Sequence, residues 1–195
     1  ITVGIQIAAP LAGYLVPPAF ADFIEMKLQV HGIQAQRLSG NRRNVPVERF
    51  KTGSAAFAAT SFESHQGLSI TGAWQEQRVD VAAGSLYVPI AQPKAKLLMA
   101  LLEPQAPDSY LAWGFFNDLF ERKEYMEDYV AEEVARDMLK DPAIKAEFDA
   151  KLAADKAFAD SPQQRLEFFA RKHSSWDDHY QAYPVLRTAV DFSGN

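Results

Sequence analysis

The order in which strand and helix signals follow one another is the feature that most constrains the fold of this chain. Short apolar or alternating runs, separated by turn residues at roughly ten-residue spacing, fill most of the first hundred positions. After residue 94 the apolar positions recur three or four residues apart, between residues that cap helices. Segregated strands and helices are typical of the α+β class. We therefore predict an α+β fold, with an antiparallel, β-sandwich-like N-terminal half and a helical C-terminal half.

The pattern predicts individual elements as well. Pro17-Pro18 begins an early helix, in which Phe20, Ile24 and Leu28 form one apolar stripe. Asp141 and Ser161 each precede a proline and are expected to cap later helices. The expected strands are 2–7, 13–16, 33–38, 45–51, 55–63, 68–73, 78–81 and 85–90, and further helices are expected at 94–102 and 124–140. In the last of these the expected inward stripe is Met126, Val130, Val134 and Met138, with Tyr125 and Tyr129 beside it.

Charge changes along the chain at nearly the same place as the secondary-structure signals. Residues 1–100 carry nine basic and six acidic side chains, whereas residues 101–195 carry eleven basic and nineteen acidic ones. We therefore expect a β-rich region at 1–104, with one or two helices. We also expect a helical region at 105–195 that packs on this β-rich region, either as a second domain or as part of one continuous domain.

Composition excludes several classes of function. The 195 residues include no cysteine, which removes disulfides, thiolate catalysis and iron–sulfur clusters. The net charge of −5 argues against nucleic acid as the main partner, because phosphate binding requires clustered positive charge. No run of apolar residues is long enough for a transmembrane helix. The first residue is Ile1, so we expect the chain to be a piece of a longer protein.

Histidines are the natural starting point in a search for chemistry. The four are His31, His65, His173 and His179, and none lies in a His-x-x-Glu or His-Glu-x-x-His motif. His31 falls at a helix C-terminus, where a cation suits the helix dipole, and His65 lies beside a turn.

One local cluster has the residue types of a metal site. His173, Asp177, Asp178 and His179 could supply two nitrogen and two oxygen ligands, which makes them weak candidates. The structural alternative is that Asp177-Asp178 simply occupies the first turn of a helix, where the dipole favours acidic residues. We expect no cofactor in this region.

Other catalytic motifs are missing from the sequence. The glycines are scattered, so there is no phosphate-binding loop, and there is no Gly-x-Ser-x-Gly elbow. Trp74, Trp113 and Trp176 could stack on sugars, although single tryptophans are more often core or interface residues. By residue chemistry alone we assign no catalytic residue.

An ordered series of short motifs nevertheless has a family likeness. The motifs are 13–17 (GYLVP), 31–33 (HGI), 62–66 (FESHQ), 82–93 (AAGSLYVPIAQP), 97–104 (LLMALLEP), 111–117 (LAWGFFN) and 183–187 (YPVLR). Together they resemble the C-terminal region of large bacterial zinc carboxypeptidases of the M14 family. The resemblance covers most of the chain, from about Gly13 to Arg187.

That resemblance implies that catalysis belongs to another part of a longer protein. The catalytic module of the family carries His-x-x-Glu, a later histidine, a substrate-binding arginine and a glutamate that activates the zinc-bound water. None of these matches a position here. The resemblance thus implies an accessory, non-catalytic C-terminal domain, whose partner is the catalytic domain of the same polypeptide and whose parent binds zinc in that missing domain. It also implies a periplasmic or secreted location.

Three functions follow from these observations. The first is the accessory domain of a carboxypeptidase, with Trp113, Phe115 and Phe116 as candidate interface residues. The second is a binding module for glycans, cell-wall fragments or peptides, which would use Trp74 or Trp176. The third is a small metal-dependent hydrolase using His173, Asp177 and His179. The sequence leaves the oligomeric state open.

Overall fold

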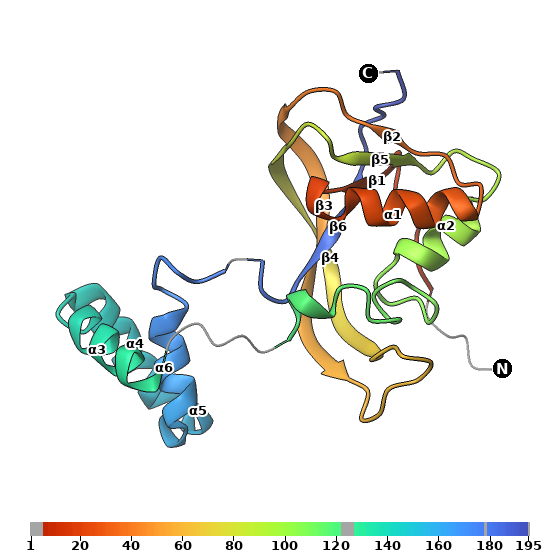
Figure 1. The fold of residues 1–195 in the computed structure, drawn as a ribbon. Helices are drawn as coiled ribbons and strands as arrows, with labels where there is room; N and C mark the ends of the chain where they lie inside the picture. Colours follow the sequence, from red (N-terminus) through yellow and green to blue (C-terminus); the bar gives the residue numbers. More distant parts are fainter. Residues whose placement is uncertain (1–5, 122–126, 178, 195) are drawn as a thin grey trace. The chain divides into compact units, whose positions relative to one another are not determined.

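The computed structural model describes residues 6–121, 127–177 and 179–194, which form two compact units (Figure 1). The first unit comprises Ile1–Glu121 and His179–Asn195, and the second comprises Arg122–Asp178. The first carries the sheet and the second is helical. The α+β class is therefore confirmed. The shift in composition lies near residue 104, whereas the boundaries of the compact units lie after Glu121 and before His179.

The first unit is built on one six-stranded sheet in which every neighbouring pair is antiparallel. The strands lie in the order β2-β5-β1-β6-β3-β4. Their bounds are β1 Gly13–Val16, β2 Gln36–Arg37, β3 Arg42–Phe57, β4 Leu68–Val81, β5 Leu86–Pro89 and β6 Ala182–Thr188. The strands thus form a single sheet with a packed cluster on each face, rather than two facing sheets.

Helices cover one face of this sheet. The first unit contains α1 Pro18–Val30, α2 Ala95–Leu102 and the short 3₁₀ helix η1 Asn117–Leu119. In Figure 1, α1 lies across β1 and β5, with which it is in contact. Ala21, Ile24 and Leu28 are its buried residues, which confirms two of the three predicted stripe positions. The helix ends at Val30 with His31 as its C-cap residue, and Gly32 follows with φ of 62°, a left-handed conformation that favours glycine.

The described residues of the second unit form four helices around a small aromatic cluster. Its helices are α3 Asp128–Met138, α4 Pro142–Ala154, α5 Lys156–Asp160 and α6 Pro162–Ala170. Asp141 caps α4 and Ser161 caps α6 through side-chain oxygens, as predicted. Phe148 packs against Phe158, Phe168 and Phe169, with ring centroids 4.8–5.7 Å apart. Among the described residues, no helix of either unit is long and apolar enough to cross a membrane.

Apart from element ends, such as those of the predicted strand 33–38, of which only Gln36–Arg37 form β2, three expectations differ from the structure. First, 45–51 and 55–63 largely merge into β3, where Gly53 lies at the irregularity between Thr52 and Ser54. The predicted strands 68–73 and 78–81 merge into β4, because residues 74–77 also pair with β3. Second, β6 lies in the region predicted to be helical. Third, the buried residues of α3 are Ala131 and Ala135, whereas Val130, Val134 and Met138 of the predicted stripe are half-buried, and Met138 packs against the aromatic cluster. The small alanines let α3 pack closely against α6.

Some expectations fall outside the described residues. Residues 1–5 of the predicted strand 2–7 are among them, as are Tyr125 and Met126 at the start of the predicted helix 124–140. Asp178 of the candidate metal cluster is outside them too.

Candidate functional site

A row of polar side chains crosses four strands on one face of the sheet. Tyr14 of β1 lies opposite Arg187 of β6, Arg187 lies opposite Glu48 of β3, and Glu48 lies opposite Glu76 of β4. Directly opposed residues of antiparallel strands project toward the same face. The register therefore places one tyrosine, one arginine and two glutamates in a line, although they come from both ends of the chain.

Arg187 forms a buried bidentate ion pair with Glu103, which directly follows α2. Nε of Arg187 donates to Oε1 of Glu103 at 2.9 Å, and Nη2 donates to Oε2 at 2.6 Å. The two side chains are only 7% and 2% exposed. The hydroxyl of Tyr14 donates to the same Oε1 at 2.6 Å. The buried carboxylate therefore accepts three charge-assisted hydrogen bonds, which offset the cost of removing both charges from water.

The guanidinium of Arg187 has three further neighbours. Nη2 donates to the carbonyl oxygen of Ala8 at 2.9 Å, and Nη1 lies 3.9 Å from Oε2 of Glu48. The guanidinium carbon is 4.3 Å from the centre of the Trp74 ring, a cation–π contact. One side chain therefore links the N-terminal segment, the sheet and the end of α2.

Burial also keeps the phenols around this ion pair in their protonated, neutral form. Burial, and then the neighbouring Glu103 charge, raises the pKa of Tyr14 above its ordinary value. Burial raises the pKa of Tyr183 in the same direction, and its hydroxyl donates to the carbonyl oxygen of Leu102 at 2.6 Å. Both phenols are therefore neutral hydrogen-bond donors at physiological pH.

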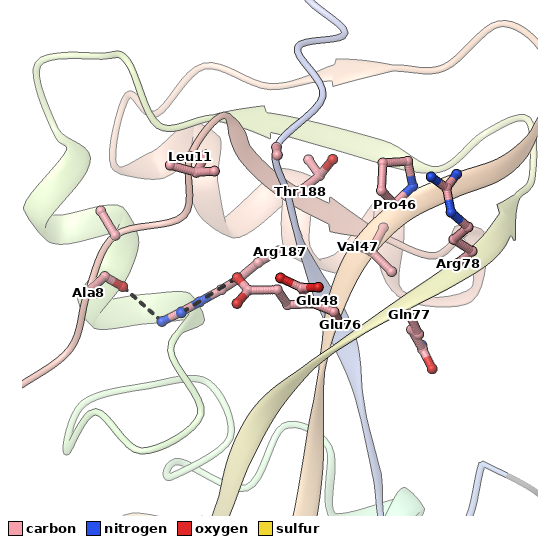
Figure 2. Close-up of a pocket in the computed structure, with 12 residues that line it drawn as sticks. Ala8, Leu11, Pro46, Val47, Glu48, Glu76, Gln77, Arg78, Arg187 and Thr188 are labelled. Atoms are coloured by element: carbon pink, nitrogen blue, oxygen red, sulfur yellow. Dashed lines mark hydrogen bonds and ion pairs between the residues drawn. The ribbon is translucent and has the colours of Figure 1, made fainter.

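An open pocket of about 510 Å³ adjoins Arg187 (Figure 2). Figure 2 shows the Arg187 guanidinium between Ala8 and Glu48, to which dashed lines connect it. The lining comprises Ala8, Ala9 and Leu11 of the N-terminal segment, Pro46, Val47 and Glu48 of β3, Glu76, Gln77 and Arg78 of β4, and Arg187, Thr188 and Ala189.

The chemistry that this pocket offers is recognition of polar groups. Its charged lining consists of Glu48, Glu76, Arg78 and Arg187, and Arg187 is already neutralised by Glu103. No histidine is among the described lining residues. The hydroxyl of Thr188 accepts from the backbone N–H of Val190 at 3.0 Å, so this hydroxyl is engaged locally. An activated hydroxyl nucleophile with an adjacent histidine base is therefore not assembled among these residues.

The predicted interface residues lie together in the first unit. Phe116 is fully buried and packs edge-on against Phe20 and Tyr183, with centroids 5.4 and 5.5 Å apart. Trp113 and Phe115 are half-buried. The His65 ring lies between them, 5.5 Å from Trp113 and 4.9 Å from Phe115. The role of the three aromatic residues at an interface stays a prediction.

Gly114 makes this aromatic arrangement possible. Its φ of 79° is in the left-handed region, and a Cβ atom there would lie 2.3 Å from the carbonyl oxygen of Gln66. The backbone of residues 111–117 thus approaches the tip of the β3–β4 hairpin at a distance that only glycine permits. Asn117 adds a hydrogen bond from Nδ2 to the same carbonyl at 2.8 Å.

The candidate metal ligands belong to different units. His173 and Asp177 are in the second unit, and His179 is in the first. Nδ1 of His173 is 2.8 Å from Oγ of Ser175 and accepts from the backbone N–H of that residue at 3.2 Å. Within the described ranges, no group of three or more His, Cys, Asp or Glu side chains converges as a metal site. The metal-ligand role of these residues stays a prediction.

The tryptophans considered for stacking on sugars have other neighbours. Trp74 packs against Phe50 at 5.4 Å and lies beneath Arg187. Trp176 lies beneath the guanidinium of Arg171, 4.9 Å from ring centre to guanidinium carbon.

The Tyr14–Glu103–Arg187 cluster is not evident from the sequence. All three residues occur in the motifs quoted above, but their chemistry appears only when β1, β6 and the end of α2 are brought together. Partners 84 and 89 residues apart leave no local spacing signal. The one available hint was Glu103 itself, a charged residue directly after the apolar helix 95–102.

Comparison with known proteins gives one set of matches. Carboxypeptidase 2 of Trichophyton tonsurans and carboxypeptidase 2 of Trichophyton equinum are each 30% identical to this chain over 101 residues. Carboxypeptidase 2 of Trichophyton rubrum is 29% identical over the same length. Each match covers 52% of this chain but 18% of the relative. No family model and no solved structure matches.

These matches indicate that the chain contains a carboxypeptidase-related region. The relatives are fungal, so the expected bacterial M14 origin stays a prediction. The chain spans less than a fifth of the length of the curated relatives it matches.

Proposed function

We propose that this chain is the accessory, non-catalytic C-terminal domain of a zinc-dependent carboxypeptidase, and that it packs against or borders the catalytic domain. The observation that carries the proposal is the likeness to carboxypeptidase 2 over 101 residues. The parent would remove C-terminal residues from peptides, with zinc bound in the catalytic domain. The parent would be periplasmic or secreted.

A surface suited to such packing supports the proposal. We call it the aromatic surface, and define it as Phe62, His65, Trp113 and Phe115. Phe62 is 67% exposed, which is unusual for a large apolar side chain. Nζ of Lys27 lies 4.1 Å from the centre of the Phe115 ring, so this cation lies against the aromatic surface. Half-buried aromatics beside an exposed phenylalanine are typical of interfaces that bury a hydrophobic centre.

A direct assay tests the lack of catalysis. The 195-residue chain is incubated with blocked peptides and zinc, and release of the C-terminal residue is measured beside the full-length parent. We expect release by the parent alone. Release by the 195-residue chain would contradict the proposal.

A pair of exposed substitutions tests the packing surface. Phe62→Asp places a charge on the aromatic surface, whereas Tyr129→Asp is a matched control at a side chain that is 72% exposed in α3. In the isolated chain, both variants should unfold at the wild-type temperature. In the full-length parent, we expect only Phe62→Asp to lower the unfolding temperature of the catalytic domain. Equal behaviour of the two variants there would remove the aromatic surface from the proposed interface.

A further inference from the structure

The two edges of the sheet differ in how they are protected from other strands. The β2 edge is only two residues long, and its Arg37 is tied to Asp22 at 2.6 Å and to Glu25 at 2.7 Å. The opposite edge, β4, is 14 residues long. Natural proteins usually shorten an edge strand, or place proline, lysine or a bulge in it, because unpaired backbone groups attract another strand. Residues 68–81 contain neither proline nor lysine.

β4 also runs without a bulge of its own. Both irregularities of the β3–β4 ladder are extra residues in β3, between Arg42 and Val45 and between Thr52 and Ser54. A continuous strand alternates in the direction of its backbone groups, so residues two apart point their N–H groups the same way. The Leu68 N–H donates away from β3, to the carbonyl oxygen of Ala112 at 3.2 Å. The even-numbered residues of β4 therefore point their backbone groups outward.

Most of this outward row has no backbone partner within the described parts of the chain. Among the described residues, the Leu68 bond is the only backbone hydrogen bond on that side of β4. From Ile70 to Asp80 the outward groups are thus available to a further strand. An antiparallel partner strand must point its own backbone N–H and C=O groups toward β4 at every second residue. A second copy of β4 meets this requirement.

We propose that β4 pairs with β4 of a second copy of this chain, antiparallel about a twofold axis at Gln77. In this register Glu76 of each copy lies opposite Arg78 of the other, and all four side chains are exposed. Both residues are in the outward set, so they form a hydrogen-bonded pair across the axis. The charge pattern is complementary to itself, which favours a second copy over an unrelated strand.

Glu76 gives a further reason for this register. Within one copy it lies opposite Glu48, and like charges in opposed positions destabilise a sheet. No described residue forms an ion pair with Glu76. Arg78 of the second copy would supply the missing cation. Within one copy, Nη1 of Arg78 donates to the carbonyl oxygen of Asn44 at 2.9 Å, which leaves the Nε and Nη2 groups of Arg78 for a carboxylate of the second copy. The alternative pairing of Arg78 with Asp80 is less suitable, because Asp80 already accepts from the backbone N–H of Asn44 at 2.9 Å.

Charge reversal provides the decisive test, with sedimentation velocity on the 195-residue chain over a concentration series. The wild-type chain should form a dimer. Glu76→Arg and Arg78→Glu should each weaken it at least about tenfold, since each places like charges opposite one another. The double variant E76R/R78E should restore dimerisation. An equimolar mixture of the two single variants should form a heterodimer, in which every opposed pair is again complementary, and such rescue also shows that both variants are folded.

The control is Glu133→Arg, an identical charge change at an exposed position of α3, which should leave dimerisation unchanged.

Amide hydrogen exchange locates the interface. The Glu76 and Arg78 amides should gain protection on dimerisation, whereas the Gln75 and Gln77 amides, which face β3, should be protected in both states. A chain that stays monomeric up to about 1 mM would overturn the proposal, because even weak complexes are populated there. A dimer whose β4 amides exchange freely, or that tolerates either single reversal, would overturn it equally.

Discussion

At the scale of single residues, the Arg187–Glu103 pair has the greatest consequence for the first unit. Each charge is almost fully removed from water, a loss that only the partner and its hydrogen bonds offset. The pair joins β6 to the end of α2, and the hydrogen bond from Tyr14 to Glu103 adds β1 to the same cluster. We therefore expect the pair to be sensitive to the loss of either member.

The first prediction concerns this pair. Arg187→Ala or Glu103→Gln should lower the free energy of unfolding by about 3–5 kcal/mol, because each leaves a buried group without its partner. The measurement is urea unfolding at neutral pH. Arg136→Ala is a matched control, since it breaks an exposed i,i+4 pair with Glu132 and should cost less than about 1 kcal/mol. Similar losses for Arg187→Ala and Arg136→Ala would show that the buried pair is not integral to the fold.

The second prediction concerns alkaline pH. Burial raises the pKa of Tyr110 to about 12 and shifts Tyr14 and Tyr183 upward too. The unfolded state therefore loses its phenolic protons first. The stability from these neutral phenols is fully present below about pH 10 and falls above it, by roughly 1.4 kcal/mol per pH unit for each fully buried phenol. Unfolding free energies measured from about pH 8 to 11 test this, and a flat profile above the ordinary tyrosine pKa would contradict it.

Tyr110→Phe separates one phenol from the others. Among the described residues the buried Tyr110 hydroxyl has no hydrogen-bond partner, so its removal should leave stability at neutral pH unchanged or raise it by about 1 kcal/mol. The same variant should lose less stability than wild type above pH 10. A variant that is destabilised at neutral pH would instead show that the hydroxyl has a partner.

At the scale of elements, signals within a short window were predictable and pairings between distant segments were not. Asp141 and Ser161 cap their helices because each lies within three residues of the N–H groups that it accepts from. The sequence did not indicate β6, because its six consecutively buried residues at 183–188 do not alternate; their burial results from a central position between β1 and β3. The candidate site depends on that strand. Tyr14, Glu103 and Arg187 each lie in a sequence motif, but the sequence did not indicate that the three side chains come together.

The third prediction concerns the loop that holds the aromatic surface. Gly114→Ala should lower the free energy of unfolding by about 1–3 kcal/mol, because the backbone is left-handed and the new Cβ meets the Gln66 carbonyl. Thermal unfolding and the near-ultraviolet signal of Trp113 report the change. Gly53→Ala is the control, because its Cβ would be 3.4 Å from Oγ1 of Thr71, an ordinary contact, and the loss should be close to zero. Equal losses at both positions would contradict this account.

At the scale of the whole molecule, the second unit is an insertion into the first. The chain leaves the sheet unit at Glu121 and re-enters it at His179, directly before β6. The backbone N–H of Gln181 donates to the carbonyl oxygen of Leu119 at 2.7 Å, so the two ends of the insertion leave from neighbouring points of the first unit. A division based on composition assigns each half of the chain to one region. It therefore does not detect that the last residues of the chain, from His179 onward, belong to the first unit.

The fourth prediction follows from that insertion. Replacing residues 122–178 with about six Gly/Ser residues should leave the first unit folded, because such a linker spans roughly 13 Å and the ends flank a hydrogen-bonded pair. The shortened chain should unfold cooperatively and keep the slow amide exchange of β6, since β6 pairs with both β1 and β3. Phe148→Ala in the complete chain is the companion experiment: it should lower the stability of the aromatic cluster in the second unit and leave exchange in β6 unchanged. Loss of β6 protection in either variant would mean that the helical unit is required for the sheet to form.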